Sequence, residues 1–157
     1  MYVIMTDPQR HEENNEKAVE KLAWTIQASQ GQFKLILARC NYASIYDTLI
    51  EKLHKICECD INVFYLKESE MDLYNIIREE SNHEVQVLMI LGLESLYNPP
   101  QFWTSANYMH KEFFNNFSFP LVLWINNDVY QQMKQLAPDL ENWATTINFL
   151  SCLFPSS

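Results

Sequence analysis

Residues 85–91 read Val-Gln-Val-Leu-Met-Ile-Leu, and this stretch decides the fold class. A short segment that is apolar at nearly every position is typical of a strand covered on both faces, as in a parallel sheet. Three other short segments have the same character, at residues 33–38, 61–66 and 121–125. The sequence therefore predicts four buried strands.

The segments between these strands carry apolar residues at the spacing of amphipathic helices. The predicted helices lie around residues 19–26, 44–56, 69–77, 98–117, 129–136 and 140–149. Ser44 with Asp47, and Ser69 with Asp72, resemble capping boxes at helix starts. This alternation of helices and strands predicts a three-layer α/β domain, with a mostly parallel four-stranded sheet and helices on both faces.

The chain of 157 residues has the length of one domain. Its aromatic content of 13% and its long aliphatic segments exclude a disordered chain. We therefore expect a single α/β domain over residues 1–157, with a polar lead-in at residues 1–15. The domain is either complete in itself or the N-terminal part of a longer multidomain protein.

The charge balance narrows the range of partners. The formal net charge is −9, from 11 Lys and Arg against 20 Asp and Glu, so the surface repels polyphosphate and no nucleic-acid partner is expected. No segment approaches the roughly 18 apolar residues of a membrane span, and the first nine residues lack the pattern of a secretory signal. The thiols of Cys40, Cys57, Cys59 and Cys152 are then expected to be reduced, in a cytoplasmic protein.

Glycine is scarce in this chain. Gly31 and Gly92 are its only two glycines, where average usage of about 7% would give roughly 11. A glycine-rich phosphate loop, a dinucleotide fingerprint and a nucleophile elbow each need glycines close together. The sequence excludes all three.

The carboxyl ends of the predicted strands hold the candidate ligand-binding residues, because ligands of open α/β sheets bind at that edge. These candidates are Arg39, Asn41 and Tyr42 after the first strand, Glu94 after the third and Asn126 after the fourth. A polar rim of this kind is also expected without any ligand, because strand ends emerge into water.

Magnesium-dependent phosphoryl transfer is not supported by these loops. The loop after the first strand has no glycine, no lysine and no serine or threonine before Ser44, although phosphate loops use all of these. The third strand ends in Leu91 and Gly92 instead of an acid that could hold magnesium. No catalytic residue, metal or cofactor is therefore expected.

Two cysteine-based alternatives remain open. Cys40 precedes a predicted helix, and a helix N-terminus lowers the pKa of a nearby thiol, so Cys40 is a candidate nucleophile. The histidines are expected away from it, which favours an inert thiol. His54, Cys57 and Cys59 with Cys40 could also be imagined as zinc ligands, but their spacing is not that of the usual ligand pairs.

Three stretches carry a resemblance to a known class of protein. They are residues 32–42, the string Phe119-Pro120-Leu121-Val122-Leu123-Trp124-Ile125-Asn126, and the string Ala137-Pro138-Asp139-Leu140 followed by Trp143. From about Val19 to Phe149 the chain resembles the N-terminal NTPase-like region of bacterial STAND signalling proteins, the signal-transduction ATPases with numerous domains.

The resemblance implies a P-loop NTPase-like domain, in a longer chain that also holds tetratricopeptide or WD repeats. It places residues 39–42 where the phosphate loop would be, Leu91 where the magnesium-binding acid would be, and Asn126 at a polar sensor position. The chain therefore looks like a degenerate member that lacks the P-loop.

The leading hypothesis is a non-catalytic regulatory or protein-interaction domain of a signalling protein, with protein partners or self-association. An alternative is binding of a nucleotide or small metabolite, without hydrolysis, at the carboxyl edge of the strands. A second alternative is a cysteine-dependent enzyme that uses Cys40.

Overall fold

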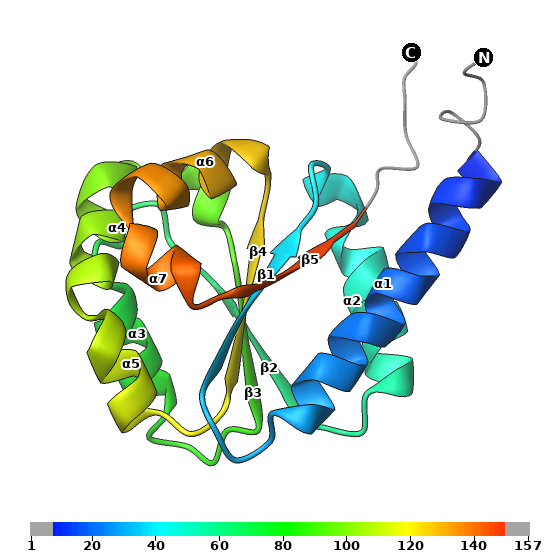
Figure 1. Ribbon diagram of the computed structural model, residues 1–157, viewed down its shortest axis with the longest axis horizontal. Helices are drawn as coiled ribbons and strands as arrows, with labels where there is room; N and C mark the ends of the chain where they lie inside the picture. Colours follow the sequence, from blue (N-terminus) through cyan, green and yellow to red (C-terminus); the bar gives the residue numbers. More distant parts are fainter. Residues whose placement is uncertain (1–7, 150–157) are drawn as a thin grey trace.

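The protein forms a parallel sheet between two layers of helices (Figure 1). The computed structural model describes the backbone of residues 8–149 and the side chains of residues 14–149. The strands are β1 (Lys34–Arg39), β2 (Ile61–Tyr65), β3 (Val87–Leu91), β4 (Pro120–Ile125) and β5 (Thr145–Asn148). Their order across the sheet is β2-β3-β4-β1-β5, and every neighbouring pair is parallel. The prediction of a parallel α/β fold is confirmed.

The prediction of four strands is wrong, because the sheet has five within the described residues 8–149. Residues 140–149 were expected to be helical, but helix α7 ends at Asn142 and β5 begins at Thr145. Thr145 and Thr146 are β-branched and favour an extended backbone. Ile36 to Arg39 of β1 pair with the new strand, which crosses in front of the other strands in Figure 1.

Within residues 8–149, seven helices cover the two faces of the sheet. One face carries α1 (Pro8–Ala28) and α2 (Tyr46–Ile56), on the right in Figure 1. The other carries α3 (Leu73–Glu80), α4 (Pro99–Tyr108), α5 (His110–Asn116), α6 (Asn127–Leu136) and α7 (Pro138–Asn142). Short 3-10 turns follow β1 and β3, at Ala43–Ile45 and Leu93–Ser95.

The helix boundaries correct several expectations. Helix α1 begins at Pro8, so much of the predicted polar lead-in is helical. Ser44 caps no helix, because α2 starts at Tyr46 with Ile45 as its N-cap residue. Helix α3 is capped by Asp72, whose side chain accepts a hydrogen bond from Asn75 N at 3.0 Å. The predicted helix over 98–117 is broken at Met109 into α4 and α5.

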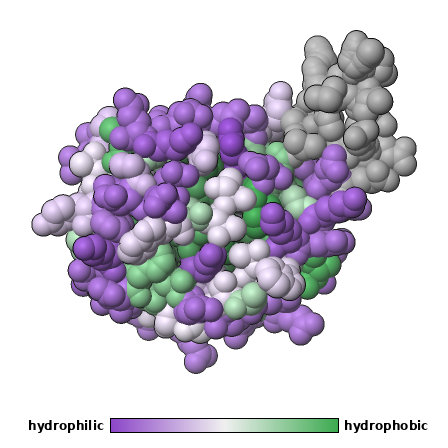
Figure 2. Space-filling model, in the orientation of Figure 1, coloured by the Kyte–Doolittle hydropathy of each residue, from purple (hydrophilic) through white to green (hydrophobic). Residues whose placement is uncertain are grey.

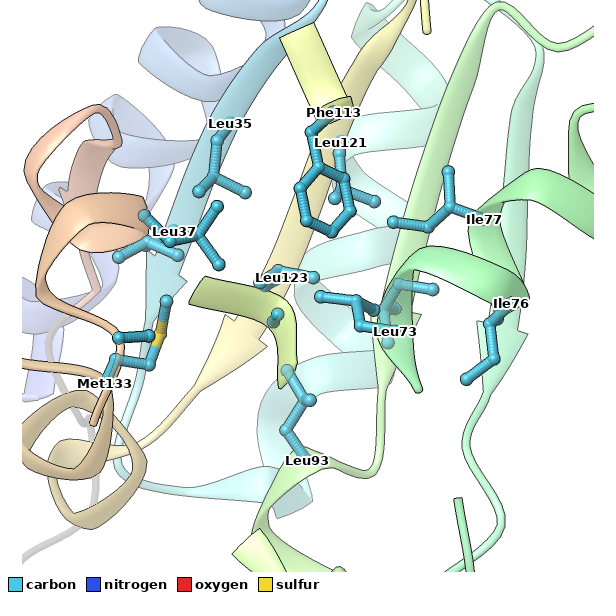
Figure 3. Close-up of a cluster of buried hydrophobic side chains, with 14 of the residues drawn as sticks. Leu35, Leu37, Leu73, Ile76, Ile77, Leu93, Phe113, Leu121, Leu123 and Met133 are labelled. Atoms are coloured by element: carbon cyan, nitrogen blue, oxygen red, sulfur yellow. The ribbon is translucent and has the colours of Figure 1, made fainter. Parts of the chain in front are cut away.

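The alternation of side chains along the strands builds two cores. Leu35, Leu37, Leu121 and Leu123 point to the side of α3 to α7, where Figure 3 shows them with Phe113, Leu73 and Met133. Ile36, Ala38, Val122 and Trp124 point to the side of α1 and α2. Every residue of β3 and β4 is buried, as expected for central strands of a sheet covered on both faces.

Hydrophilic residues cover most of the face seen in Figure 2, with hydrophobic residues in small patches between them. Among the helices of residues 8–149, none combines the length and the apolar character needed to cross a membrane.

Candidate functional site

The topology of the sheet selects one crevice. Strands β1 and β4 are neighbours, yet the chain leaves β1 toward α2 on one face and leaves β4 toward α6 on the other. Ligands of open α/β sheets bind at such a switch point, outside the carboxyl ends of the strands. The candidate site therefore lies where β1 and β4 end.

A pocket of about 280 Å³ lies at this point. It is lined by Asn41 and Tyr42 from the loop after β1, and by Asn126, Asn127 and Asp128 from the start of α6. Its lining offers amide groups, one phenol and one carboxylate. An arrangement of this kind can exchange hydrogen bonds with a small polar molecule.

A hydrogen-bonded bridge joins the two sides of the crevice. Asn127 N donates to Asn41 Oδ1 at 2.9 Å, and Arg39 Nε donates to Asn127 Oδ1 at 2.8 Å. The Arg39 guanidinium also lies over the Tyr130 ring, 4.4 Å from its centroid. Arg39 is thus held by α6, and the loop after β1 is fixed to the first turn of that helix.

The N-terminus of α6 is capped by side chains of the protein itself. Val129 N donates to Asn126 Oδ1 at 2.9 Å, and Asn127 N is taken by Asn41. Free amides in the first turn of a helix are the groups that bind phosphate or other anions. At α6 two of these amides already have partners.

The loop after β1 is also folded on itself. Cys40 N donates to Ile125 O at 2.8 Å, Ile45 N donates to Tyr42 O at 3.1 Å, and Tyr46 N donates to Ala43 O. The first bond joins the loop to β4, and the other two form the 3-10 turn at Ala43–Ile45. The amides of Cys40, Ile45 and Tyr46 are therefore directed to carbonyl groups of the protein.

Tyr46 fixes this loop to the sheet. Its ring packs on Trp124 of β4 with centroids 5.1 Å apart, and its hydroxyl donates to Cys40 O at 3.1 Å. Only 4% of Tyr46 is exposed. Burial, followed by the charges of Glu94 and Cys40, raises the pKa of the Tyr46 phenol well above its usual value. The neutral phenol is the form that fits this site.

The structure brings together three of the five candidate residues. Asn41, Tyr42 and Asn126 line the pocket, and Arg39 reaches its rim through Asn127. Glu94 does not line the pocket; it lies exposed in the 3-10 turn after β3. All five remain candidates for ligand binding.

The five candidate residues do not include two residues of the pocket, Asn127 and Asp128. Both directly follow Asn126, in the polar stretch after β4, so their position in the sequence was a usable signal. The hydrogen bonds of Asn127 to Asn41 and Arg39 could not be predicted from the sequence, because they depend on β1 lying beside β4.

Among the described residues, Cys40 and Cys57 are buried and Cys59 is partly buried. Cys40 is 1% exposed, and its thiol donates to Tyr42 O at 3.6 Å. Burial and the neighbouring Cys57 raise the pKa of Cys59 to about 11. Within residues 14–149, no three His, Cys, Asp or Glu side chains are grouped so that they could hold a metal ion. Cys152 lies outside the described residues.

Comparison with known proteins supports the fold alone. No family model matches the chain, and no curated protein matches it in sequence. A solved structure, the ORC2 protein of Aeropyrum pernix in its ADP form, is similar with a TM-score of 0.50 and 11% sequence identity. The similarity covers 88% of this chain and 47% of the ORC2 chain. The chain thus has an NTPase-like α/β fold and spans about half the length of that protein.

Proposed function

We propose that this chain is a degenerate NTPase-like domain that does not hydrolyse nucleotide and serves as a regulatory or protein-interaction module. The observation that carries the proposal is the bridge from Asn41 and Arg39 to Asn127. It occupies, with protein side chains, the crevice in which this fold class would hold a ligand.

The chemistry of phosphate binding supports this proposal. A phosphate-binding loop directs several backbone amides and a lysine at its ligand. Here the amides of Cys40, Ile45, Tyr46, Asn127 and Val129 all have partners within the protein. Rebuilding such a site would require breaking these bonds, and each contributes about 0.5–1.5 kcal/mol.

The resemblance to STAND proteins supports a place in a longer signalling protein. Their NTPase-like region precedes repeat domains, and a region without hydrolysis would act there through contacts with other modules. The similarity to the ADP form of ORC2 makes ADP the first nucleotide to test.

Calorimetric titration with ADP and ATP, each with magnesium, tests the proposal. We expect no binding heat up to about millimolar nucleotide and no release of phosphate. A thermal unfolding curve of the same sample serves as the control that the protein is folded. Micromolar binding accompanied by turnover would overturn the proposal.

Binding of a nucleotide or small metabolite without hydrolysis is the second candidate, because the pocket of about 280 Å³ stays open beside the bridge. A ligand present at 100 times its dissociation constant stabilises the protein by about 2.7 kcal/mol. A thermal-shift series with nucleotides therefore separates the two candidates. A shift that Asn126→Ala abolishes, without phosphate release, favours the second.

A cysteine-dependent enzyme is a third reading, which the burial of Cys40 disfavours. A nucleophilic thiol must be accessible and must have a lowered pKa. Alkylation with iodoacetamide tests this reading. We expect Cys40 to react only after the protein is unfolded, and rapid reaction of Cys40 in the folded protein at neutral pH would revive it.

A further inference from the structure

In the described part of the chain, residues 8–149, the edge of the sheet formed by β2 is open. Strand β2 has only β3 as a neighbour in the five-stranded order. None of its residues is fully buried, and Tyr65 is 63% exposed, whereas all residues of β3 and β4 are buried. This edge therefore differs sharply from the interior of the sheet.

The hydrogen-bond alternation identifies the backbone groups on that edge. Leu66 N donates to Leu91 O at 2.9 Å, and the residues before it pair with β3 in parallel register. Backbone groups alternate in direction along a strand. Ile61, Val63 and Tyr65 thus direct their N–H and C=O groups away from β3, where the described part of the chain places no other strand.

Nothing in the sequence of β2 protects this edge. Natural proteins prevent edge-to-edge pairing with lysine, proline, inward charges or bulges. Strand β2 reads Ile-Asn-Val-Phe-Tyr and contains no charge and no proline. Its backbone is therefore available for pairing with an added extended strand.

The charges around β2 define the partner. Glu58 and Asp60 precede the strand, and Glu68 and Glu70 follow it, with Lys67 as the only cation in this stretch. Two copies joined through this edge would bring like charges together, which costs free energy. A basic segment meets the opposite charge at both ends of the strand.

We propose that the open edge of β2 binds an extended segment of a protein partner, with apolar and β-branched residues at its centre and Lys or Arg at both ends. This segment would pair with β2 as a sixth strand. Five residues of β2 span about 17 Å, so a matching segment has five paired residues and, with two basic residues at each end, a length of roughly nine. This inference rests on the proposed function only in treating the chain as a protein-interaction module. Its test uses no nucleotide.

The probe is the synthetic peptide Lys-Lys-Val-Thr-Val-Thr-Val-Lys-Lys, titrated into the wild-type chain. We expect saturable binding by fluorescence anisotropy. Hydrogen exchange measured by NMR should slow at the outward amides of Ile61, Val63 and Tyr65, and should change little at Asn62 and Phe64, which already face β3. The same peptide with all of its backbone amides methylated has no backbone N–H group to donate from either edge, and its affinity should fall at least tenfold.

Charge reversal supplies the matched protein variants. Glu58→Lys with Glu68→Lys should weaken the lysine peptide at least tenfold, and should strengthen a peptide with Glu in place of Lys. Glu20→Lys with Glu112→Lys makes the same change in net charge on α1 and α5. This control should leave the affinities for both peptides within about twofold of those of the wild type.

Any of three results with the peptides would overturn the proposal: no binding at millimolar peptide, equal binding of the methylated peptide, or an equal loss of affinity in the control variant with Glu20→Lys and Glu112→Lys. Concentration-dependent dimerisation that Val63→Pro abolishes would assign the edge to a second copy, and it would overturn the proposal as well. None of these results bears on nucleotide hydrolysis, so failure here is distinguishable from failure of the proposed function.

Discussion

At the scale of single residues, Tyr46 decides how the loop after β1 is held. Its hydroxyl bonds to Cys40 O, and its ring packs on Trp124 of the neighbouring strand. The sequence presents Tyr46 only as one more residue of an amphipathic helix. Its role depends on β4 lying beside β1, because Trp124 is far from Tyr46 in the sequence.

The raised pKa of Tyr46 predicts a pH dependence of stability. Above a pH of about 10 the unfolded chain loses the phenol proton while the folded protein keeps it, so stability falls as pH rises. Between pH 9 and pH 11 the wild type should lose about 1.4 kcal/mol more than Tyr46→Phe. Urea unfolding at both pH values measures this difference.

The control for the loss of one phenol is Tyr65→Phe, a substitution at an exposed tyrosine. At pH 8, Tyr46→Phe itself should cost about 0.5–1.5 kcal/mol, because one buried hydrogen bond is lost. A wild type and a Tyr46→Phe variant that decline in parallel above pH 10 would contradict the assignment of the shift to this residue.

At the scale of elements, the start of α6 links the fold to the candidate site. Asn126 caps the helix through Val129 N, and it also lines the pocket. Replacing an Asn cap with Ala typically costs about 1 kcal/mol, whereas Ser keeps an acceptor oxygen. Asn126→Ala should therefore lower the free energy of urea unfolding by about 1 kcal/mol, and Asn126→Ser by clearly less. Equal losses in the two variants would show that the cap contributes little.

Four of the five strands were predictable from sequence to within two residues. Their apolar content reflects burial on both faces, which is a strong local signal. Strand β5 was not predicted, because it has only four residues and follows a helix that begins with proline. Its Thr-Thr-Ile-Asn sequence was interpreted as the end of that helix. Its assignment depends on pairing with β1, which no local pattern reveals.

The candidate site was predictable only in part. Polar residues after the strands were expected at one edge of the sheet, and Asn41, Tyr42 and Asn126 do line one pocket. The order of the strands was not predictable, so the contact from Asn41 to Asn127 was not either. Glu94 follows β3, one strand further away, and this explains its position outside the pocket.

At the scale of the whole molecule, the excess of negative charge opposes compaction. The chain carries 20 acidic residues against 11 basic ones. Within residues 14–149 a single ion pair joins side chains, Lys52 to Glu16 at 3.7 Å. Self-repulsion of this kind destabilises the compact state and is screened by salt.

Salt should therefore stabilise the protein. Raising NaCl from about 0.02 to about 0.2 M should increase the free energy of unfolding by on the order of 1 kcal/mol. The Glu58→Lys and Glu68→Lys variant carries less negative charge, so its salt effect should be smaller. Unfolding curves that do not move with salt would indicate that the acidic residues are too dispersed to repel one another.

The central position of β1 has a consequence for the nascent chain. This strand is among the first to leave the ribosome, yet both of its neighbours, β4 and β5, are translated much later. At about 5–20 residues per second, roughly 4 to 16 seconds pass between the end of β1 and the start of β4. Throughout that interval β1 lacks both of its strand neighbours, so its backbone groups can be reached by chaperones and by other unfinished chains.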